Sequence, residues 1–188
     1  MQMIYIFFGM VASGKSTLAR SFAGRHHIPC YNTDRVRKEL AGLTPTGRRP
    51  DGINQGIYSK EFTGKTYQAM LERTRKDIDA GKSGVVLDGS YHRRHEREQV
   101  RRMAMELGVS CKFIHCICHE GEVRRRLEKR SRDPKAVSDG RWEVYLAQKK
   151  NFEQPDELLP AELIVLDTEN DVDMLLERLE VGLDMKNM

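Results

Sequence analysis

The sequence contains 188 residues, of which 39% are hydrophobic and 32% are charged. This length and composition predict one domain with its own core, and they exclude repeat folds, low-complexity tails and membrane-spanning segments. The 32 basic residues exceed the 28 acidic residues by a net charge of +4, too small an excess to indicate a duplex nucleic-acid binder by itself.

Apolar segments along the chain predict five strands. Because these segments are mostly continuous rather than alternating, we expect the strands to be buried on both faces. The predicted strands are residues 3–8, 28–31, 84–87, 111–117 and 163–166. Helical patterns lie between them, at residues 15–23, 65–80, 93–107, 120–131, 140–152 and 172–183, and several end next to a glycine.

This alternation of strands and helices predicts an α/β fold, with a parallel sheet and helices on both faces. Ligands of such sheets bind beyond the carboxyl ends of the strands. Residues 42–64 and 133–139 look irregular, as is typical of binding loops and lids. We therefore expect a single domain over residues 1–188, with an acceptor-binding insertion at about 42–64 and a lid at about 120–140.

The first strand leads directly into the segment GMVASGKST. Gly9, Gly14, Lys15 and Ser16 fit the phosphate-binding pattern GxxxxGK[ST], between a predicted strand and a predicted helix. Backbone N–H groups of such a loop surround phosphate oxygens at the positive end of the helix. Lys15 is expected to reach the β- and γ-phosphates of a nucleotide and Ser16 to bind Mg²⁺. The remaining loop positions expected to contact the nucleotide are Ala12, Ser13 and Thr17.

An aspartate follows the second predicted strand. Phosphoryl transfer to a hydroxyl group requires a carboxylate that orients the hydroxyl and accepts its proton, and Asp34 lies where ligands are expected. Arg37, three residues further on, would share a helical face with Asp34 and could hold the acceptor or the aspartate. The alternative is that Asp34 only caps a helix, a role that aspartate favours.

The third predicted strand ends in a single acid, Asp88. Next to the phosphate loop, this carboxylate would hold Mg²⁺ together with Ser16, directly or through water, or help to position the acceptor. The alternative is that Asp88 and Gly89 only form a turn. A second acid does not follow Asp88, which argues against a hydrolytic motor.

Arginines are clustered along the chain. Most are expected to lie on solvated helix faces, including those from Arg93 to Arg102, while a minority line a site for anionic groups. Arg126 and Arg130 lie four residues apart on one predicted helix, where they could contact a nucleotide and neutralise the transferred phosphoryl group. Ion pairs with Glu122 and Glu128 are the alternative role for these two arginines.

The four cysteines are expected to be reduced. Cys116 and Cys118 fall in a predicted buried strand, and the apolar N-terminal segment lacks a basic leader, so we expect a cytoplasmic protein. The run CICH could suggest zinc, but a second ligand pair at the required spacing is missing from the sequence.

Together, the segments GMVASGKS, TDRVR, VVLDGSYHRRHER, RLEKR and LDT resemble the small P-loop kinases of the adenylate, shikimate and gluconate kinase fold. The nearest resemblance is to the predicted kinases close to polynucleotide 5'-hydroxyl kinases, zeta toxins and chloramphenicol phosphotransferase. It implies a three-layer P-loop NTPase fold with five parallel strands in the order 2-3-1-4-5 and a small helical lid.

The same resemblance implies roles for individual residues. Asp34 would be the general base, Arg37 would contact the acceptor, and Arg126 and Arg130 would grip ATP. Adenine would lie near Asp167 and Thr168. With Lys15, these assignments give four expected catalytic residues: Lys15, Asp34, Arg37 and Arg130.

The sequence therefore predicts a kinase that transfers the γ-phosphoryl group of ATP, with Mg²⁺, to a hydroxyl group of a small molecule. The motif DGSYHRR differs from the DGFPR pattern of nucleoside monophosphate kinases, which disfavours a nucleoside monophosphate acceptor. Two alternatives stay open: a polynucleotide 5'-hydroxyl kinase, whose acceptor is a nucleic-acid end, and an ATP-binding module that hydrolyses ATP slowly.

Overall fold

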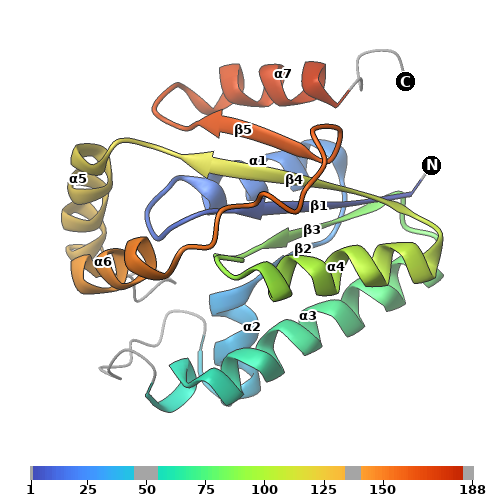
Figure 1. Cartoon of the computed structure of the whole chain (residues 1–188), viewed down its shortest axis with the longest axis horizontal. Coiled ribbons are helices and arrows are strands. Elements are labelled where there is room, and N and C mark those ends of the chain that lie inside the picture. Colours follow the sequence, from blue (N-terminus) through green and yellow to red (C-terminus); the bar gives the residue numbers. More distant parts are fainter. Residues whose placement is uncertain (1, 45–54, 134–140, 184–188) are drawn as a thin grey trace.

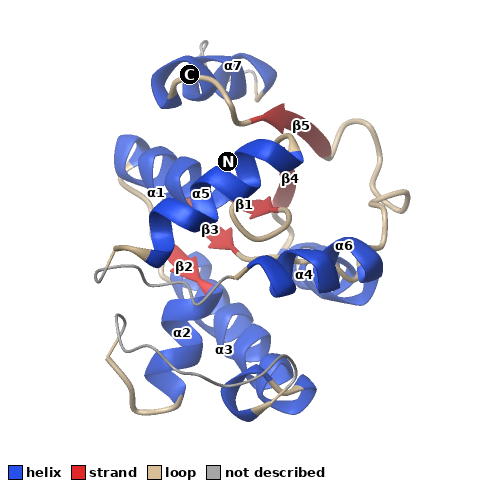
Figure 2. Cartoon of the chain, turned by 90° about the vertical axis from the view of Figure 1, so that its left-hand side faces the viewer, coloured by secondary structure: helices blue, strands red, loops and turns tan. Residues whose placement is uncertain are grey.

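The computed structural model describes residues 2–44, 55–133 and 141–183 of the chain. Its five strands form one sheet in the order β2-β3-β1-β4-β5, and every neighbouring pair is parallel. Figure 2 shows this order with the strands seen nearly end-on. The strands are β1 (Met3–Phe8), β2 (Cys30–Asn32), β3 (Gly84–Asp88), β4 (Ser110–Ile117) and β5 (Leu163–Asp167). The predicted fold class and strand order are confirmed.

The helices of the described residues cover both faces and one edge of this sheet (Figure 1). They are α1 (Lys15–His26), α2 (Thr33–Leu40), a short 3-10 helix η1 (Gly56–Tyr58), α3 (Lys60–Asp79), α4 (Arg94–Leu107), α5 (Glu120–Ser131), α6 (Trp142–Asn151) and α7 (Val172–Gly182). No helix among these residues is both long and apolar enough to cross a lipid bilayer.

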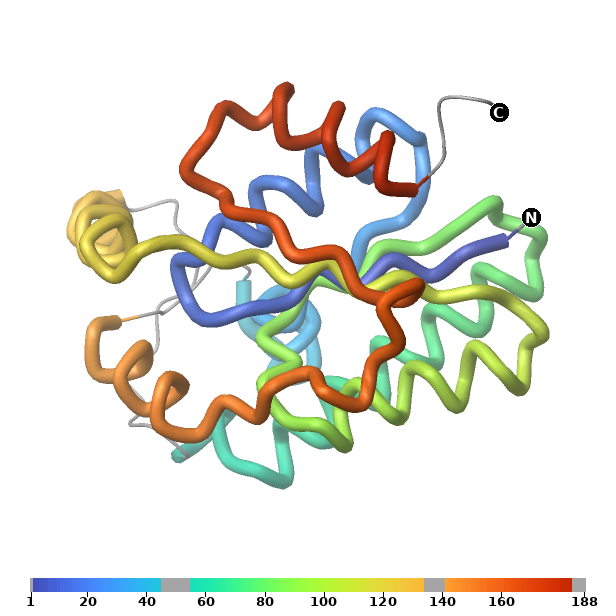
Figure 3. Tube along the Cα trace, turned by 45° about the horizontal axis from the view of Figure 1, so that its top comes forward, coloured from blue at the N-terminus to red at the C-terminus, as the bar shows by residue number. Residues whose placement is uncertain are grey.

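Side chains of the central strand β1 alternate between two cores. Ile4, Ile6 and Phe8 are fully buried in a cluster with residues of α3 and α4, whereas Phe7 belongs to the opposite cluster, with residues of α1 and α7. Figure 3 shows α1 and α7 on one face of the sheet and α3 and α4 on the other. A central strand buried on both faces explains why its sequence is continuously apolar.

The carboxyl ends of the parallel strands meet at one edge of the sheet, where α5 and α6 lie beyond them (Figure 1). A third apolar cluster joins these two helices to the loop after β1. Its buried members are Val11, Ala12, Val123, Leu127 and Tyr145. This packing fixes the loop against the two helices that were expected to form or flank a lid.

Two predicted boundaries differ from the structure by three residues or more. Gly24 does not end the first helix; α1 continues to His26, and His27 adopts the left-handed conformation at its C-cap (φ 53°). A single glycine inside a helix costs only about 1 kcal/mol, and the His26 ring packs against Phe22 with 4.4 Å between centroids.

The second wrong boundary lies in the predicted irregular segment 42–64. The end of this segment is helical, because α3 already begins at Lys60. Ser59 is the N-cap of α3, and its side chain accepts a hydrogen bond of 3.2 Å from the Phe62 N–H. Residues 45–54 and 134–140, parts of the predicted insertion and lid, lie outside the described residues.

Candidate active site

A cavity of about 1320 Å³ lies at the carboxyl edge of the sheet. It is lined by the loop after β1 and by residues of α2, η1, α3, α5 and α6, together with the residues that follow β3 and β5. Pockets for a single small ligand usually measure roughly 300–1,000 Å³. This cavity is therefore large enough for two ligands side by side.

The loop after β1 has the backbone conformation that a phosphate-binding loop requires. Gly14 is the N-cap of α1 and has φ 85°, which favours glycine. A Cβ atom at Gly14 would also lie 2.7 Å from Thr168 Oγ1. The N-terminus of α1 thus opens onto the cavity, with Lys15, Ser16 and Thr17 among the lining residues.

Distant residues clamp three consecutive positions of this loop. The Val11 N–H donates a 2.7 Å hydrogen bond to Gln148 Oε1, and Arg126 Nη1 donates to the Ala12 carbonyl at 3.3 Å. Thr168 Oγ1 donates to the Ser13 carbonyl at 2.6 Å. The loop is therefore held by α6, by α5 and by the residue after β5.

Two of the predicted loop contacts do not line the cavity. A Cβ at Gly9 would lie 2.3 Å from the Cys116 carbonyl oxygen, so this glycine allows close packing against β4. Ser13 is 3% exposed, and its Oγ has no hydrogen-bond partner among the described residues. Of the other predicted loop positions, Ala12, Gly14, Lys15, Ser16 and Thr17 all line the cavity.

Lys15 is held inside the cavity. Its Nζ donates a 3.1 Å hydrogen bond to the Met10 carbonyl. Burial lowers the pKa of Lys15, and the negative charges of Asp88 and Asp34 oppose that shift. The ammonium group therefore lies between the loop and the two predicted functional carboxylates.

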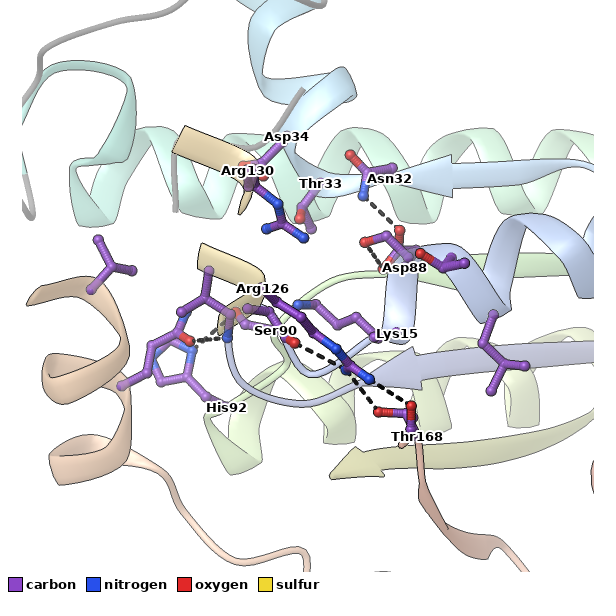
Figure 4. A pocket seen from close by; sticks show the side chains of 18 of the residues that line it. Lys15, Asn32, Thr33, Asp34, Asp88, Ser90, His92, Arg126, Arg130 and Thr168 are labelled. Carbon is purple, nitrogen blue, oxygen red and sulfur yellow. Dashed lines mark hydrogen bonds between the residues drawn. The ribbon is translucent and has the colours of Figure 1, made fainter. Parts of the chain in front are cut away.

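Asp88 is fully buried at the end of β3. Ser16 Oγ donates to one carboxylate oxygen at 3.1 Å, and Asn32 Nδ2 donates to the other at 2.6 Å. Burial raises the pKa of Asp88, while Lys15 and these two hydrogen bonds act in the opposite direction. The structure thus brings together Ser16 and Asp88, the two residues predicted to hold a metal ion. Figure 4 shows Asn32 beside Asp88, joined by their hydrogen bond.

Asp34 does not cap a helix, so that alternative was wrong. Asn32 is the N-cap of α2, and its Oδ1 accepts a 3.1 Å hydrogen bond from the Arg35 N–H. Asp34 lies in the first turn and lines the cavity, where its Oδ1 accepts a hydrogen bond of 3.0 Å from Arg37 Nη1. The Arg37 guanidinium also lies over the Tyr58 ring, 4.9 Å from its centroid.

The two predicted lid arginines both line the cavity. Arg126 Nη2 donates to the Thr168 carbonyl at 2.6 Å, and its Nε donates to Glu122 at 2.6 Å, so the expected ion pair coexists with the contact to the loop after β5. The guanidinium group of Arg130 points into the cavity (Figure 4). Burial lowers the pKa of Arg130, and the charge of Asp34 opposes this shift.

Sequence reasoning missed several residues of the cavity wall. Asn32 positions Asp88, and Gln148 holds the phosphate loop. Ser90 Oγ and His92 Nδ1 share a hydrogen bond of 3.1 Å, and burial lowers the pKa of His92 to about 4. Asn32 could have been identified from the sequence, because it directly precedes the motif TDRVR. The helix that carries Gln148 was predicted, but nothing in the sequence indicates that Gln148 contacts the phosphate loop.

The residues that line the cavity fit a nucleoside triphosphate and a divalent cation. The cradle between Gly14 and Thr168 leaves no room for a side chain, Lys15 projects into the cavity, and Ser16 and Asp88 offer oxygen ligands of the kind that Mg²⁺ prefers. The cavity also extends beyond this cradle to Asp34 and Arg37.

This fold and cavity define a P-loop NTPase domain of the small-kinase type. Residues 4–155 match the AAA_33 family, described as an AAA domain, and the chain belongs to this family. Uncharacterized proteins of Mycobacterium tuberculosis (strain H37Rv) and Mycobacterium bovis are 33% identical to it over 108 residues. The match covers 57% of this chain but 22% of each relative, so the chain spans about a fifth of their length.

Solved structures with the same fold include three kinases. A sugar kinase from Janibacter has a TM-score of 0.67 at 22% identity, with 97% of this chain and 94% of that chain covered. A gluconokinase from Sinorhizobium meliloti has a TM-score of 0.63 at 18% identity, with 98% and 92% covered. The APS kinase CysC of Mycobacterium tuberculosis, solved with AMPPNP and APS, has a TM-score of 0.66 at 15% identity, with 97% of both chains covered. The predicted small P-loop kinase fold is confirmed.

Proposed function

We propose that this protein is an ATP-dependent kinase that transfers the γ-phosphoryl group of ATP to a hydroxyl group of a small molecule. The observation that carries the proposal is that Asp34 lines the same cavity as Lys15 and Ser16. A phosphate loop alone serves switches and motors as well. Transfer to a hydroxyl group requires, in addition, a carboxylate in the same cavity as the phosphate loop.

The donor would lie along the loop after β1. Backbone N–H groups at the start of α1 and Lys15 Nζ would bind the phosphates. The adenine would lie near Thr168, which accepts a hydrogen bond from Arg126. Ser16 and Asp88 would hold a Mg²⁺ ion, whose chemistry is to neutralise the charge of the β- and γ-phosphates. The APS kinase with the same fold was solved with AMPPNP, which supports a nucleotide in this half of the cavity.

The acceptor would lie between Asp34 and Arg37. In the transfer, the hydroxyl oxygen forms a bond to the γ-phosphorus, the bond from that phosphorus to the β,γ-bridging oxygen breaks, and ADP leaves. The hydroxyl proton passes to the Asp34 carboxylate, which Arg37 orients through its 3.0 Å hydrogen bond. Arg130 would neutralise charge on the transferred group, since it lines the cavity in a partly desolvated position and interacts electrostatically with Asp34. We expect this reaction to take place in the cytoplasm, in keeping with the four free cysteines.

A mass-spectrometric screen tests this proposal. The protein is incubated with Mg-ATP and a panel of sugars, nucleosides, antibiotics and 5'-hydroxyl oligonucleotides, and the mass of one added phosphate is sought in each compound. Asp34→Asn is expected to bind ATP normally and to lose transfer, whereas Lys15→Met is expected to lose ATP binding as well. Transfer that survives in Asp34→Asn would show that Asp34 is not the base. ATP hydrolysis without any phosphorylated acceptor would favour a nucleotide-binding module instead.

A further inference from the structure

The run CICH, from Cys116 to His119, is a motif of the sequence that the proposed function does not use. Cys116 is buried in β4, and the Cys118 thiol donates a weak hydrogen bond of 4.0 Å to the Ala12 carbonyl. His119 directly precedes α5, and its exposed imidazole forms no hydrogen bond or ion pair with the rest of the described chain. Further metal ligands beside this imidazole therefore have to come from another part of the chain.

The neighbouring strand β5 supplies two carboxylates. β4 and β5 are parallel, with Ile117 opposite Asp167, so the segments that follow the two strands leave the sheet side by side (Figure 1). The His119 N–H donates a 2.6 Å hydrogen bond to Glu169 Oε1, although these two residues are 50 positions apart. An imidazole nitrogen of His119 and one carboxylate oxygen each of Asp167 and Glu169 lie within 4.8 Å of one another.

Backbone N–H groups hold both carboxylates beside the imidazole. Glu169 accepts from the His119 N–H, and Asp167 Oδ1 accepts a 3.0 Å hydrogen bond from the Glu169 N–H. Neither carboxylate forms an ion pair with a side chain of the residues that the structure describes. Two adjacent negative charges therefore have no cationic partner, which a bound metal ion would supply.

One imidazole and two carboxylates suit a zinc-type cation better than Mg²⁺. Zn²⁺ binds histidine nitrogen and carboxylate oxygen at about 2.0–2.2 Å, and three protein ligands leave its fourth position open. Tetrahedral ligand atoms at that distance are about 3.4 Å apart, so the three exposed side chains need only small rotations to surround an ion. Mg²⁺ prefers oxygen ligands alone, which Ser16 and Asp88 offer elsewhere in the cavity.

These three residues lie at the end of the cavity where the nucleotide base is expected. Glu169 lines the cavity, and Thr168, between the two acids, donates a 2.6 Å hydrogen bond to the Ser13 carbonyl of the phosphate loop. The negative charges of Asp167 and Glu169 oppose the binding of an anionic nucleotide nearby. A divalent cation between them would cancel this repulsion.

We propose that His119, Asp167 and Glu169 form a binding site for a zinc-type divalent cation, and that the bound cation strengthens nucleotide binding. The site is separate from Ser16 and Asp88, which would hold Mg²⁺. Metal binding at this site is independent of the proposed kinase function, whereas the effect on the nucleotide rests on the part of that function that places ATP in the cavity.

Calorimetry with Zn²⁺ tests the site, on protein without a histidine tag, without nucleotide and in excess Mg²⁺. His119→Gln and Glu169→Gln are each expected to weaken Zn²⁺ binding about tenfold or more, since loss of a residue that merely orients a ligand already costs roughly 10–100-fold. Glutamine at position 169 keeps an oxygen that can accept from the His119 N–H, so the local backbone contact is retained. Asp88→Asn should bind Zn²⁺ at this site as the parent does.

His95→Gln and Glu177→Gln are the matched controls, because both side chains are exposed and lie on other helices. They are expected to bind Zn²⁺ as tightly as the parent. A parent protein that binds no Zn²⁺ overturns the site. Zn²⁺ affinities of His119→Gln and Glu169→Gln that equal those of the controls overturn it as well.

The effect on the nucleotide is measured with a nonhydrolysable ATP analogue in excess Mg²⁺, with and without Zn²⁺. At low salt, Zn²⁺ is expected to tighten binding of the analogue about twofold to fivefold in the parent and not in His119→Gln. Without Zn²⁺, Glu169→Gln should bind the analogue more tightly than Glu177→Gln, because a negative charge next to the cavity is removed. An effect of Zn²⁺ that persists in His119→Gln would overturn the coupling.

The outcomes also separate this inference from the proposed function. Zn²⁺ binding that depends on His119, in a protein that phosphorylates no acceptor, would contradict the kinase and support the metal site. Phosphoryl transfer by a protein whose Zn²⁺ affinity is unchanged by His119→Gln would support the kinase and overturn the metal site.

Discussion

The side chain of Gln148 in α6 accepts a 2.7 Å hydrogen bond from the backbone N–H of Val11, in the middle of the phosphate loop. Gln148 also lines the cavity, next to Val144 and Asn151 on the same helix. The contact joins the helix that follows the predicted lid to the loop that would hold the nucleotide. It implies that the shape of the loop depends on where α6 lies.

Gln148→Met is therefore expected to weaken nucleotide binding. Methionine has a similar volume but cannot accept from the Val11 N–H, so the loop loses a hydrogen bond worth about 1 kcal/mol. Calorimetry with a nonhydrolysable ATP analogue should show about a fivefold rise in Kd. Lys150→Met, on the exposed side of the same helix, is the control. Gln148→Glu keeps an acceptor oxygen, and a Kd as poor as that of Gln148→Met would contradict this role.

Asp88→Asn is expected to remove the effect of Mg²⁺ on ATP binding. Asparagine retains one oxygen that can accept from Ser16, but it lacks the negative charge that a divalent cation requires. The affinity for ATP is measured with Mg²⁺ and with EDTA, in the parent and in the variant. The difference between the two conditions should vanish in Asp88→Asn and persist in Asp173→Asn, which changes an exposed carboxylate of α7. A difference that persists in Asp88→Asn would place the metal elsewhere.

Arg97 corrects the expectation of a solvated arginine face on α4. Its side chain is completely buried, forms an ion pair of 2.5 Å with Glu157, and donates a hydrogen bond of 2.8 Å to the Tyr91 carbonyl. Arg97→Leu leaves Glu157 as an unpaired buried charge, which typically costs about 3–5 kcal/mol. Urea unfolding should show this loss.

The double variant Arg97→Leu with Glu157→Leu should be more stable than Arg97→Leu alone, because both charges are then removed. Arg94→Leu breaks the exposed pair with Glu98 and should cost less than about 1 kcal/mol. The loss of unfolding free energy in the double variant could instead equal the sum of the losses in the two single variants. That result would mean that Arg97 and Glu157 are not coupled.

Glu96 gives the protein a pH dependence of stability. Burial raises the pKa of this carboxyl from 4.5 to about 7, although the Arg93 N–H donates a hydrogen bond to it. Between these two values the folded state binds more protons than the unfolded state, so the free energy of unfolding falls as the pH rises from about 4.5 to about 7. The size of this effect is on the order of 3 kcal/mol.

Glu96→Gln removes this titration and should flatten that part of the stability profile, measured by urea unfolding at pH 5, 6 and 7. Glu98→Gln, on the exposed side of α4, should leave the slope unchanged. A slope in Glu96→Gln equal to that of the parent would show that another group titrates there.

The sequence predicted much of this molecule because its signals are local. A buried parallel strand has to be continuously apolar, and a phosphate loop requires glycine at particular backbone angles, so β1 and the motif from Gly9 to Ser16 were identifiable without coordinates. Asp34 and Asp88 were identifiable because each follows a predicted strand, where parallel sheets gather their ligands. The strand order came from the family resemblance.

Other features depend on residues far apart in the chain, and only the tertiary structure decided them. Gln148 and Val11 are 137 positions apart, and Arg97 and Glu157 are 60 apart. No local pattern tells a buried arginine from an exposed one, or distinguishes Asn32 from Asp34 as the helix cap. Burial and hydrogen-bond partners follow from which elements pack together, so the sequence by itself determined the phosphate loop and its carboxylates, while packing decided what holds that loop and which arginines face the cavity.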